Sequence, residues 1–250
     1  MTPEVILTSG VLIFRHMKKG TLISFFMIIK SFGSLAQSSS PVPSGQNAFW
    51  ADMSGRPLYL QENYIAEGSP YFLDKYYFAE VTMVNGKVYK DIQAKVNILD
   101  NQVLYLTDDN KEMASTSAIK RIKFYNISSE DGIQNAILES FNGGLNMSKT
   151  PVYQVLDSGK YSLLKKISVT YIDSKGYGQS LVTRSFEHTE TLYCQMPDGN
   201  IIKMGRGREA VLEICVSKRK LVEAFIDKNN LKCRTAKDFQ MVFHYFNSIL

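Results

Sequence analysis

The sequence predicts an α+β fold, built mainly from antiparallel β-hairpins and completed by C-terminal helices that cover the sheet. Three observations support this class. Apolar and polar residues alternate with a period of two over residues 76–124, as in strands that bury one face. The chain contains 14 Tyr and 14 Phe but 1 Trp, and this aromatic composition favours strands. After Gly207 the apolar period becomes that of a helix.

The first hairpins are marked by Asn85-Gly86, which stands between two apolar alternations. Asn-Gly favours a type I′ turn, because that turn needs positive φ at both central residues. Residues 119–124 are predicted as a strand with basic residues outside, and residues 126–132 as a loop. Residues 134–141 fit a short helix or a strand, and the strand is favoured.

A second hairpin set is predicted over residues 152–204. Gly159-Lys160 precedes a long strand, as Gly86-Lys87 does, and each is followed by a Leu-Tyr strand and a turn containing Asp. Two similar β-units would explain this echo. Chance similarity between hairpins is the alternative.

Three helices are predicted, over residues 208–216, 218–228 and 237–247. The last follows Thr235-Ala236-Lys237-Asp238, which is the acidic form of a capping box. We expect the helices to cover an open face or edge of the sheet, because an uncovered edge can pair with other chains.

Residues 1–36 have the features of a secretory signal peptide. Met17 and two lysines form a charged start, residues 21–32 are mostly apolar, and small residues precede a cut between Ala36 and Gln37. We take Met17 as the true start, because the residues before it fit no part of a signal peptide. A membrane anchor is the rival interpretation, but the uninterrupted apolar run is shorter than the roughly 20 residues needed to span a bilayer.

The rest of the chain divides into a disordered linker (37–48), a β-rich domain (49–206) and a helical cap (207–250). The formal net charge of the whole chain is +5. Without residues 1–36 it holds 25 basic and 23 acidic residues, a net charge of +2. Nucleic-acid binders usually carry a concentrated basic face, which most of this chain lacks, so no nucleic-acid partner is expected.

Three cysteines remain after this cut: Cys194, Cys215 and Cys233. The favoured interpretation is three buried, reduced thiols, and the alternative is one disulfide with one free thiol. Their spacing fits no zinc motif. The sequence predicts no metal site and no cofactor.

Several segments together resemble a group of exported proteins. The segments are Gly68-Ser69-Pro70-Tyr71-Phe72, Asn85-Gly86-Lys87-Val88-Tyr89, residues 101–106, Val152-Tyr153-Gln154-Val155-Leu156, Gly159-Lys160, Leu163-Leu164-Lys165 and the closing Phe243-His244-Tyr245-Phe246-Asn247. With the signal peptide, they resemble uncharacterised exported β-rich proteins of Gram-negative, Bacteroidetes-type bacteria. The resemblance implies export and a β-rich fold with C-terminal helices. It implies no activity and no role for any residue.

The nearest thing to a catalytic cluster is Glu187-His188-Thr189-Glu190. On a strand, His188 and Glu190 point to the same face, so the carboxylate could orient or charge the imidazole. The favoured interpretation is that these are exposed polar residues on a solvated face, because nothing nucleophilic or metal-binding lies nearby in sequence.

A basic run over residues 203–237 contains Gly205-Arg206-Gly207-Arg208 just before a predicted helix. Arg206 and Arg208 are candidates for binding an anion with the backbone N–H groups there. The favoured alternative is the solvated outer face of the helices.

The sequence therefore leads to an exported envelope protein that is periplasmic, outer-membrane associated or secreted. Whether it is an enzyme is uncertain, and we favour a non-enzymatic binding or structural module. Its expected partners are an envelope protein or an anionic lipid or glycan surface. The alternative is an envelope hydrolase with a site near Glu187, His188 and Glu190.

Overall fold

The computed structural model describes residues 55–57, 63–129, 132–141, 144–145 and 150–250. The predicted signal peptide and linker lie outside the described residues. Within the described part of the chain, no helix combines the length and the hydropathy needed to cross a membrane.

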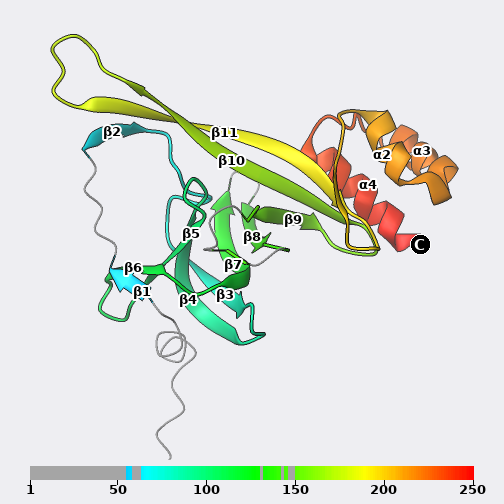
Figure 1. The fold of residues 1–250 in the computed structure, drawn as a ribbon. Coiled ribbons are helices and arrows are strands. Elements are labelled where there is room, and N and C mark those ends of the chain that lie inside the picture. The colour runs from blue at the N-terminus through cyan, green and yellow to red at the C-terminus, as the bar shows by residue number, and fades with distance from the viewer. Residues whose placement is uncertain (1–54, 58–62, 130–131, 142–143, 146–149) are drawn as a thin grey trace, which may run out of the picture. The chain divides into compact units, whose positions relative to one another are not determined.

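The described chain is mostly β, with helices at its C-terminal end, so the α+β class is confirmed (Figure 1). The strands are β1 (Gly55–Pro57), β2 (Tyr64–Glu67), β3 (Tyr77–Met83), β4 (Val88–Asn97), β5 (Gln102–Leu106), β6 (Glu112–Ser115), β7 (Ile119–Ser129), β8 (Gly132–Glu139), β9 (Tyr153–Asp157), β10 (Ser162–Ser174), β11 (Val182–Gln195) and β12 (Ile201–Lys203). The helices are α2 (Arg208–Ile214), α3 (Arg219–Lys228) and α4 (Ala236–Ser248), with a 3-10 turn at Val216–Lys218.

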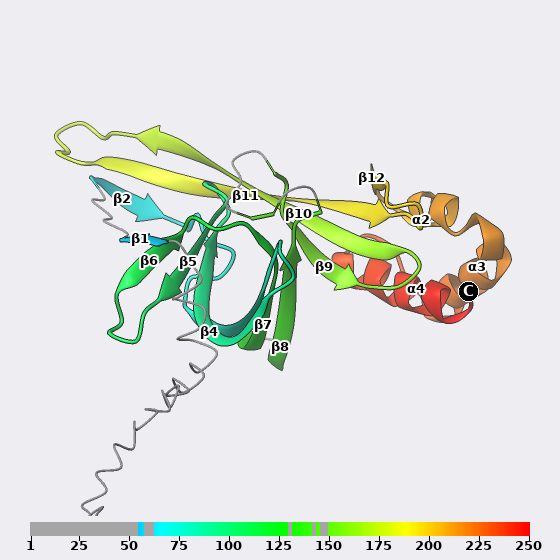
Figure 2. The same ribbon diagram turned by 60° about the horizontal axis from the view of Figure 1, so that its bottom comes forward.

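The strands form one mixed sheet in the order β1-β6-β5-β4-β3-β7-β8-β9-β10-β11-β12. Neighbours along this order are antiparallel. β2 is different, because it pairs in parallel with the first residues of β11, from Tyr64 opposite Val182 to Glu67 opposite Ser185 (Figure 2). Nothing local in the sequence predicts this pair, which joins segments more than a hundred residues apart.

Asn85 and Gly86 connect β3 to β4, but not through the type I′ turn expected from the sequence. Of the two, only Gly86 has a positive φ, of 87°. The Gly86 N–H donates to the Met83 carbonyl (3.0 Å), and the Met83 N–H donates to the Lys87 carbonyl (2.8 Å). This is a three-residue connection with a left-handed glycine at its end. The Asn85 Oδ1 accepts from the Lys87 N–H (3.0 Å), which fixes the turn locally.

The predicted loop over residues 126–132 is wrong, because β7 continues to Ser129. A bulge between Phe124 and Ile127 takes up one extra residue, and Asn126 there has φ 54°. Asparagine tolerates this left-handed conformation better than most residues, so the strand bends instead of ending. The preference for a strand over residues 134–141 is confirmed by β8.

A first hydrophobic core forms within the strands β3 to β8. In β3 the buried side chains alternate, at Ala79, Val81 and Met83, as the period of two predicts. They pack with residues of the neighbouring strands, including Ile92, Ile122 and Phe124. This core therefore joins the hairpins without side chains from the helices.

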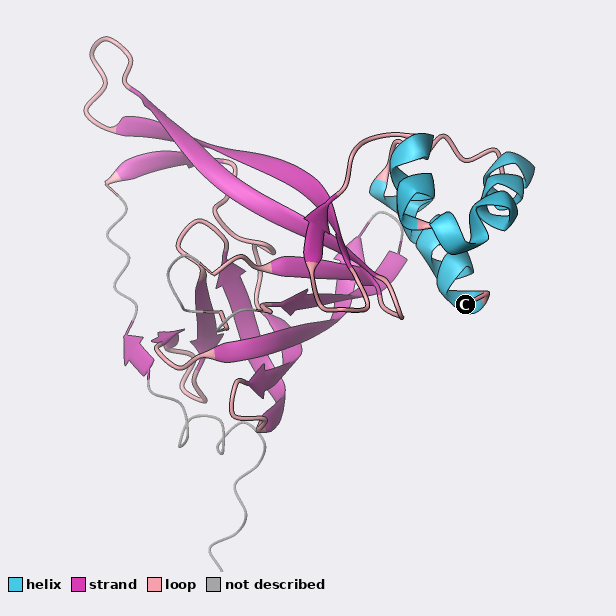
Figure 3. Ribbon diagram, turned by 45° about the vertical axis from the view of Figure 1, so that its right-hand side comes forward, coloured by secondary structure: helices cyan, strands magenta, loops and turns pink. Residues whose placement is uncertain are grey.

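A second core joins the helices to the last strands (Figure 3). Leu163 of β10 and Cys194 of β11 pack with apolar side chains of all three helices. α4 begins at the predicted capping box: the Thr235 Oγ1 accepts from the Asp238 N–H (3.2 Å), and the Asp238 carboxylate accepts from the Thr235 N–H (3.4 Å). The capping box is therefore confirmed, and it fixes the residue at which α4 begins.

Candidate functional site

Among the described residues, His188 forms its hydrogen bond with a backbone carbonyl and not with a carboxylate. The His188 Nε2 lies 2.6 Å from the Ser69 carbonyl oxygen. Because a carbonyl can only accept, this nitrogen carries the proton in the bond. Glu190 lies further along β11, and its Oε1 is 2.7 Å from the Lys165 Nζ. Glu187 lies opposite Thr170 in the β10–β11 register and is exposed. The three candidates thus have separate surroundings.

Arg208 forms an ion pair within the helical region. Its guanidinium pairs with the Asp227 carboxylate through two bonds, one of 3.1 Å. The hydrogen bond to Asp227 raises the pKa of Arg208, and the same pair lowers the pKa of Asp227. α2, which begins at Arg208, has only 7 residues and no side-chain cap. Arg208 is therefore a structural residue that joins α2 to α3.

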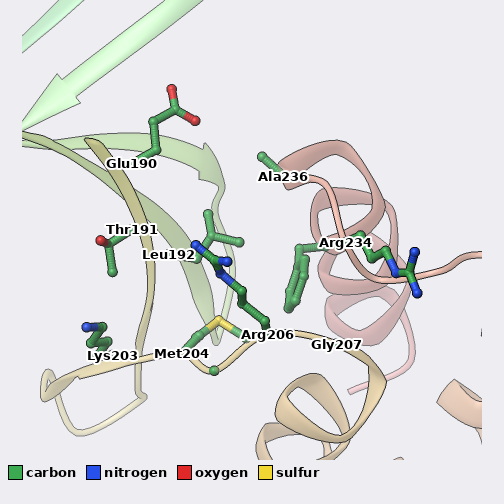
Figure 4. Close-up of a pocket in the computed structure, with 11 residues that line it drawn as sticks. Glu190, Thr191, Leu192, Lys203, Met204, Arg206, Gly207, Arg234 and Ala236 are labelled. Carbon is green, nitrogen blue, oxygen red and sulfur yellow. The ribbon is translucent and has the colours of Figure 1, made fainter. Parts of the chain in front are cut away.

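Arg206, the other candidate from the basic run, lines a pocket of about 740 Å³. The pocket lies between the β11–β12 strands and the segments that lead into α2 and α4 (Figure 4). Its lining residues are Glu190, Thr191, Leu192, Lys203, Met204, Gly205, Arg206, Gly207, Arg234, Ala236 and Phe239. The volume falls in the range of small-molecule sites.

The pocket carries more positive than negative charge. Lys203, Arg206 and Arg234 line it, and within the described residues none of these side chains has an ion-pair partner. The one acidic lining residue, Glu190, is already paired with Lys165. An anion in the pocket would therefore meet cationic groups that are not paired with any carboxylate of the described residues.

The cations differ in how they lie. In Figure 4, the Arg206 side chain extends toward Leu192, whereas Lys203 and Arg234 point to opposite sides. Lysine and arginine side chains are long and rotate easily, so the two at the margin can turn toward a bound anion. Arg206 is the residue best placed to contact it directly.

The floor of the pocket is apolar and fixed. Met204 and Phe239 belong to the second core and are 6% and 2% exposed, and Leu192 packs against that core. The N–H groups at the start of α4 are partly used by the capping box. A ligand in this pocket would therefore meet side-chain cations above a buried apolar base.

Lys95 and Tyr76 are ionisable residues outside the pocket that pack against other side chains. The Lys95 Nζ lies 4.0 Å from the Tyr71 ring centre and 4.7 Å from that of Tyr76. Burial, followed by the nearby Glu112, raises the pKa of Tyr76 far above its ordinary value. In the described residues, no group of His, Cys, Asp and Glu side chains could hold a metal ion.

The cysteines are buried and free, and all of them belong to the second core. Burial raises the pKa of Cys194 and of Cys215 to about 12. These thiols are therefore protonated at neutral pH and are poor nucleophiles.

No protein-family model, no curated protein and no solved structure matches this chain. The site must be judged from its own geometry. Sequence reasoning singled out Arg206 and placed Lys203 and Arg234 in the same basic run. It missed Leu192, Met204 and Phe239, whose apolar side chains looked like ordinary core residues.

Proposed function

We propose that this chain is an exported protein of a Gram-negative cell envelope that acts as a non-enzymatic binding module. Its ligand is a small anionic group of the envelope, and phosphate is the group that we favour. The observation that carries the proposal is the pocket in which Lys203, Arg206 and Arg234 have no carboxylate partner within the described residues. Hydrogen bonds from such cations to phosphate are among the strongest that proteins form.

The architecture supports a binding role for the second half of the chain. In this proposal the helices cover the β9–β12 end of the sheet, and the packing of Leu163 and Cys194 against them supports it. Two similar β-units are also part of the proposal. They are supported by the antiparallel series β3 to β6 and β9 to β12, each of which follows chain order. The pocket belongs to the second unit only.

The hydrolase alternative has less support. Of Glu187, His188 and Glu190, only Glu190 lines the pocket, and its carboxylate is paired with Lys165. His188 is held by a backbone carbonyl. A binding site is the simpler interpretation of a pocket in which the charged side chains without an ion-pair partner among the described residues are cations.

Titration calorimetry of the purified chain with inorganic phosphate and with glycerol phosphate tests the proposal. We expect each phosphate compound to bind at one site. Chloride at equal ionic strength is the reference anion. The double substitution Lys203→Ala with Arg206→Ala should weaken phosphate binding about tenfold or more, since a hydrogen bond to a charged group contributes about 1.5–3 kcal/mol.

The matched control removes the same charge outside the pocket, by Lys120→Ala in β7 with Lys175→Ala just beyond the end of β10. Both residues are exposed, and neither lines the pocket. The control should bind within about twofold of the original chain, because salt screens charges beyond about 10 Å. Equal weakening in both double variants, or no saturable binding, would contradict a discrete site. Stronger binding of glycerol phosphate than of inorganic phosphate would indicate a lipid headgroup.

A further inference from the structure

One strand edge of the sheet is open over a considerable length. β10 pairs with β11 along its whole length, but β9 reaches only from Leu163 to Lys166. Among the strands that the structure describes, residues 167–174 of β10 therefore pair on one side only. In Figures 1 and 2, β2 lies along the β11 side of this hairpin, and no other described strand lies along the β10 side. Unpaired backbone groups on such an edge are a template for another strand.

This edge lacks the features that usually prevent pairing. Residues 167–174 read ISVTYIDS and contain no Lys, Arg or Pro. Their one charged residue, Asp173, is paired with Arg184 at 2.7 and 2.8 Å. Tyr171 and Ile172 are 44% and 59% exposed. The edge is thus rich in β-branched and aromatic residues, and its one charge has a partner, which is a composition that favours strand pairing.

The hairpin already accepts an added strand on its other side. β2 pairs with Val182 to Ser185 of β11, at the same end of the hairpin as the open part of β10. Arg184 stacks on Tyr64 of β2 (4.4 Å) and on Tyr171 of β10 (3.9 Å), which holds the three strands together. The side chains at this end are therefore ordered enough to receive a fourth strand.

We propose that residues 167–174 pair with the same edge of a second copy of this chain and form a symmetric dimer. A two-fold axis requires the same patch on both partners, in antiparallel pairing. If the axis passes at Tyr171, this residue faces its own copy, and Thr170 faces Ile172. Aromatic pairs and pairs of β-branched residues are the cross-strand neighbours that stabilise sheets.

Charge does not oppose this pairing. In the same register Asp173 faces Val169, and each Asp173 keeps its own Arg184. No two like charges stand directly opposite each other. This self-complementarity favours a second copy over an unrelated strand, and the dimer does not depend on the proposed anion pocket.

Sedimentation analysis of the purified chain over a wide range of concentration tests the dimer. We expect reversible association to dimers. Thr170→Lys with Ile172→Lys places like charges across the interface and should give a monomer, as should Thr170→Glu with Ile172→Glu. Mixed together, the lysine and glutamate variants should associate again, because opposite charges then face each other. This recovery also shows that both variants are folded.

The matched control adds the same charge at the end of the hairpin, by Tyr177→Lys with Ser180→Lys. Both residues are exposed in the loop that connects β10 to β11. The control should dimerise like the original chain. The dimer is refuted by a chain that stays monomeric, by dimers that persist in the lysine variant, or by a mixture that stays monomeric.

Discussion

At the scale of single residues, Asp238 shows how a local motif fixes an ionisation state. Partial burial alone would raise the pKa of its carboxyl group. Backbone N–H groups of Arg234 and Thr235, together with the Thr235 hydroxyl, outweigh burial and hold that pKa below the ordinary 3.8. The capping box thus favours the carboxylate in its charged form.

A pH dependence of stability follows from this lowered pKa. The contribution of Asp238 is fully present above the unfolded value of 3.8 and is lost as the pH falls through the lower folded value. We expect Asp238→Asn to destabilise the chain by about 1 kcal/mol at neutral pH, as lost caps do. Urea unfolding should be measured at neutral pH and below pH 3.8. On acidification, the free energy of unfolding should fall less in this variant than in the original chain. Glu213→Gln, at an exposed position of α2, should follow the original chain. Identical acid profiles for Asp238→Asn and the original chain would contradict the mechanism.

At the scale of elements, the Asn247 amide makes several of the hydrogen bonds that join α4 to the sheet, beside those of Gln240 and His244. The Asn247 Oδ1 accepts from the Tyr161 N–H (3.1 Å), and its Nδ2 donates to the Tyr161 carbonyl (2.8 Å) and to the Asp157 carboxylate (3.0 Å). A Cβ at Gly159 would lie 2.5 Å from the Asn247 Cγ, so this turn needs glycine. Gly159-Lys160 and residues 243–247, both noticed in the sequence, therefore meet in space.

Asn247→Ala should loosen the helices from the sheet without opening the first core. Leaving the Tyr161 backbone groups unpaired costs about 1–3 kcal/mol. The three cysteines all belong to the second core, so they report its opening. We expect a thiol reagent to label them faster in Asn247→Ala under native conditions.

The matched control for this experiment lies in the first core. Ile122→Val should cost about 0.5–1.5 kcal/mol, as such core truncations do, with little effect on thiol labelling. Equal acceleration in both variants would mean that the two cores open together. Unchanged labelling in Asn247→Ala would mean that the amide does not hold α4.

At the scale of the whole molecule, export would remove residues 1–36. In a Gram-negative host, we expect the protein recovered from the periplasm to begin at Gln37 by N-terminal sequencing. Ala36→Arg should block the cut, because the enzyme that makes it needs small residues there. Ser40→Arg, beyond the cut, is the control and should be processed normally. Recovery of uncut protein from the original chain, in the cytoplasm or the membrane, would refute export.

The sequence by itself determined the fold class, the position of most strands and the start of α4. These are local properties, because alternation, turn residues and a capping box act over a few neighbours. It also pointed to Arg206 through the density of basic residues. It gave the wrong turn at Asn85-Gly86 and ended β7 too early, since a bulge at Asn126 cannot be told from a loop by composition.

Only the tertiary structure decided which of these residues act together. It paired β2 with β11, committed Arg208 to Asp227, and left Lys203, Arg206 and Arg234 around one pocket. Within the described part of the chain, it also gave residues 167–174 of β10 a strand partner on one side only. Each of these facts depends on contacts between residues far apart in the chain. A sequence pattern states what a segment favours, whereas packing determines which charges and edges find a partner.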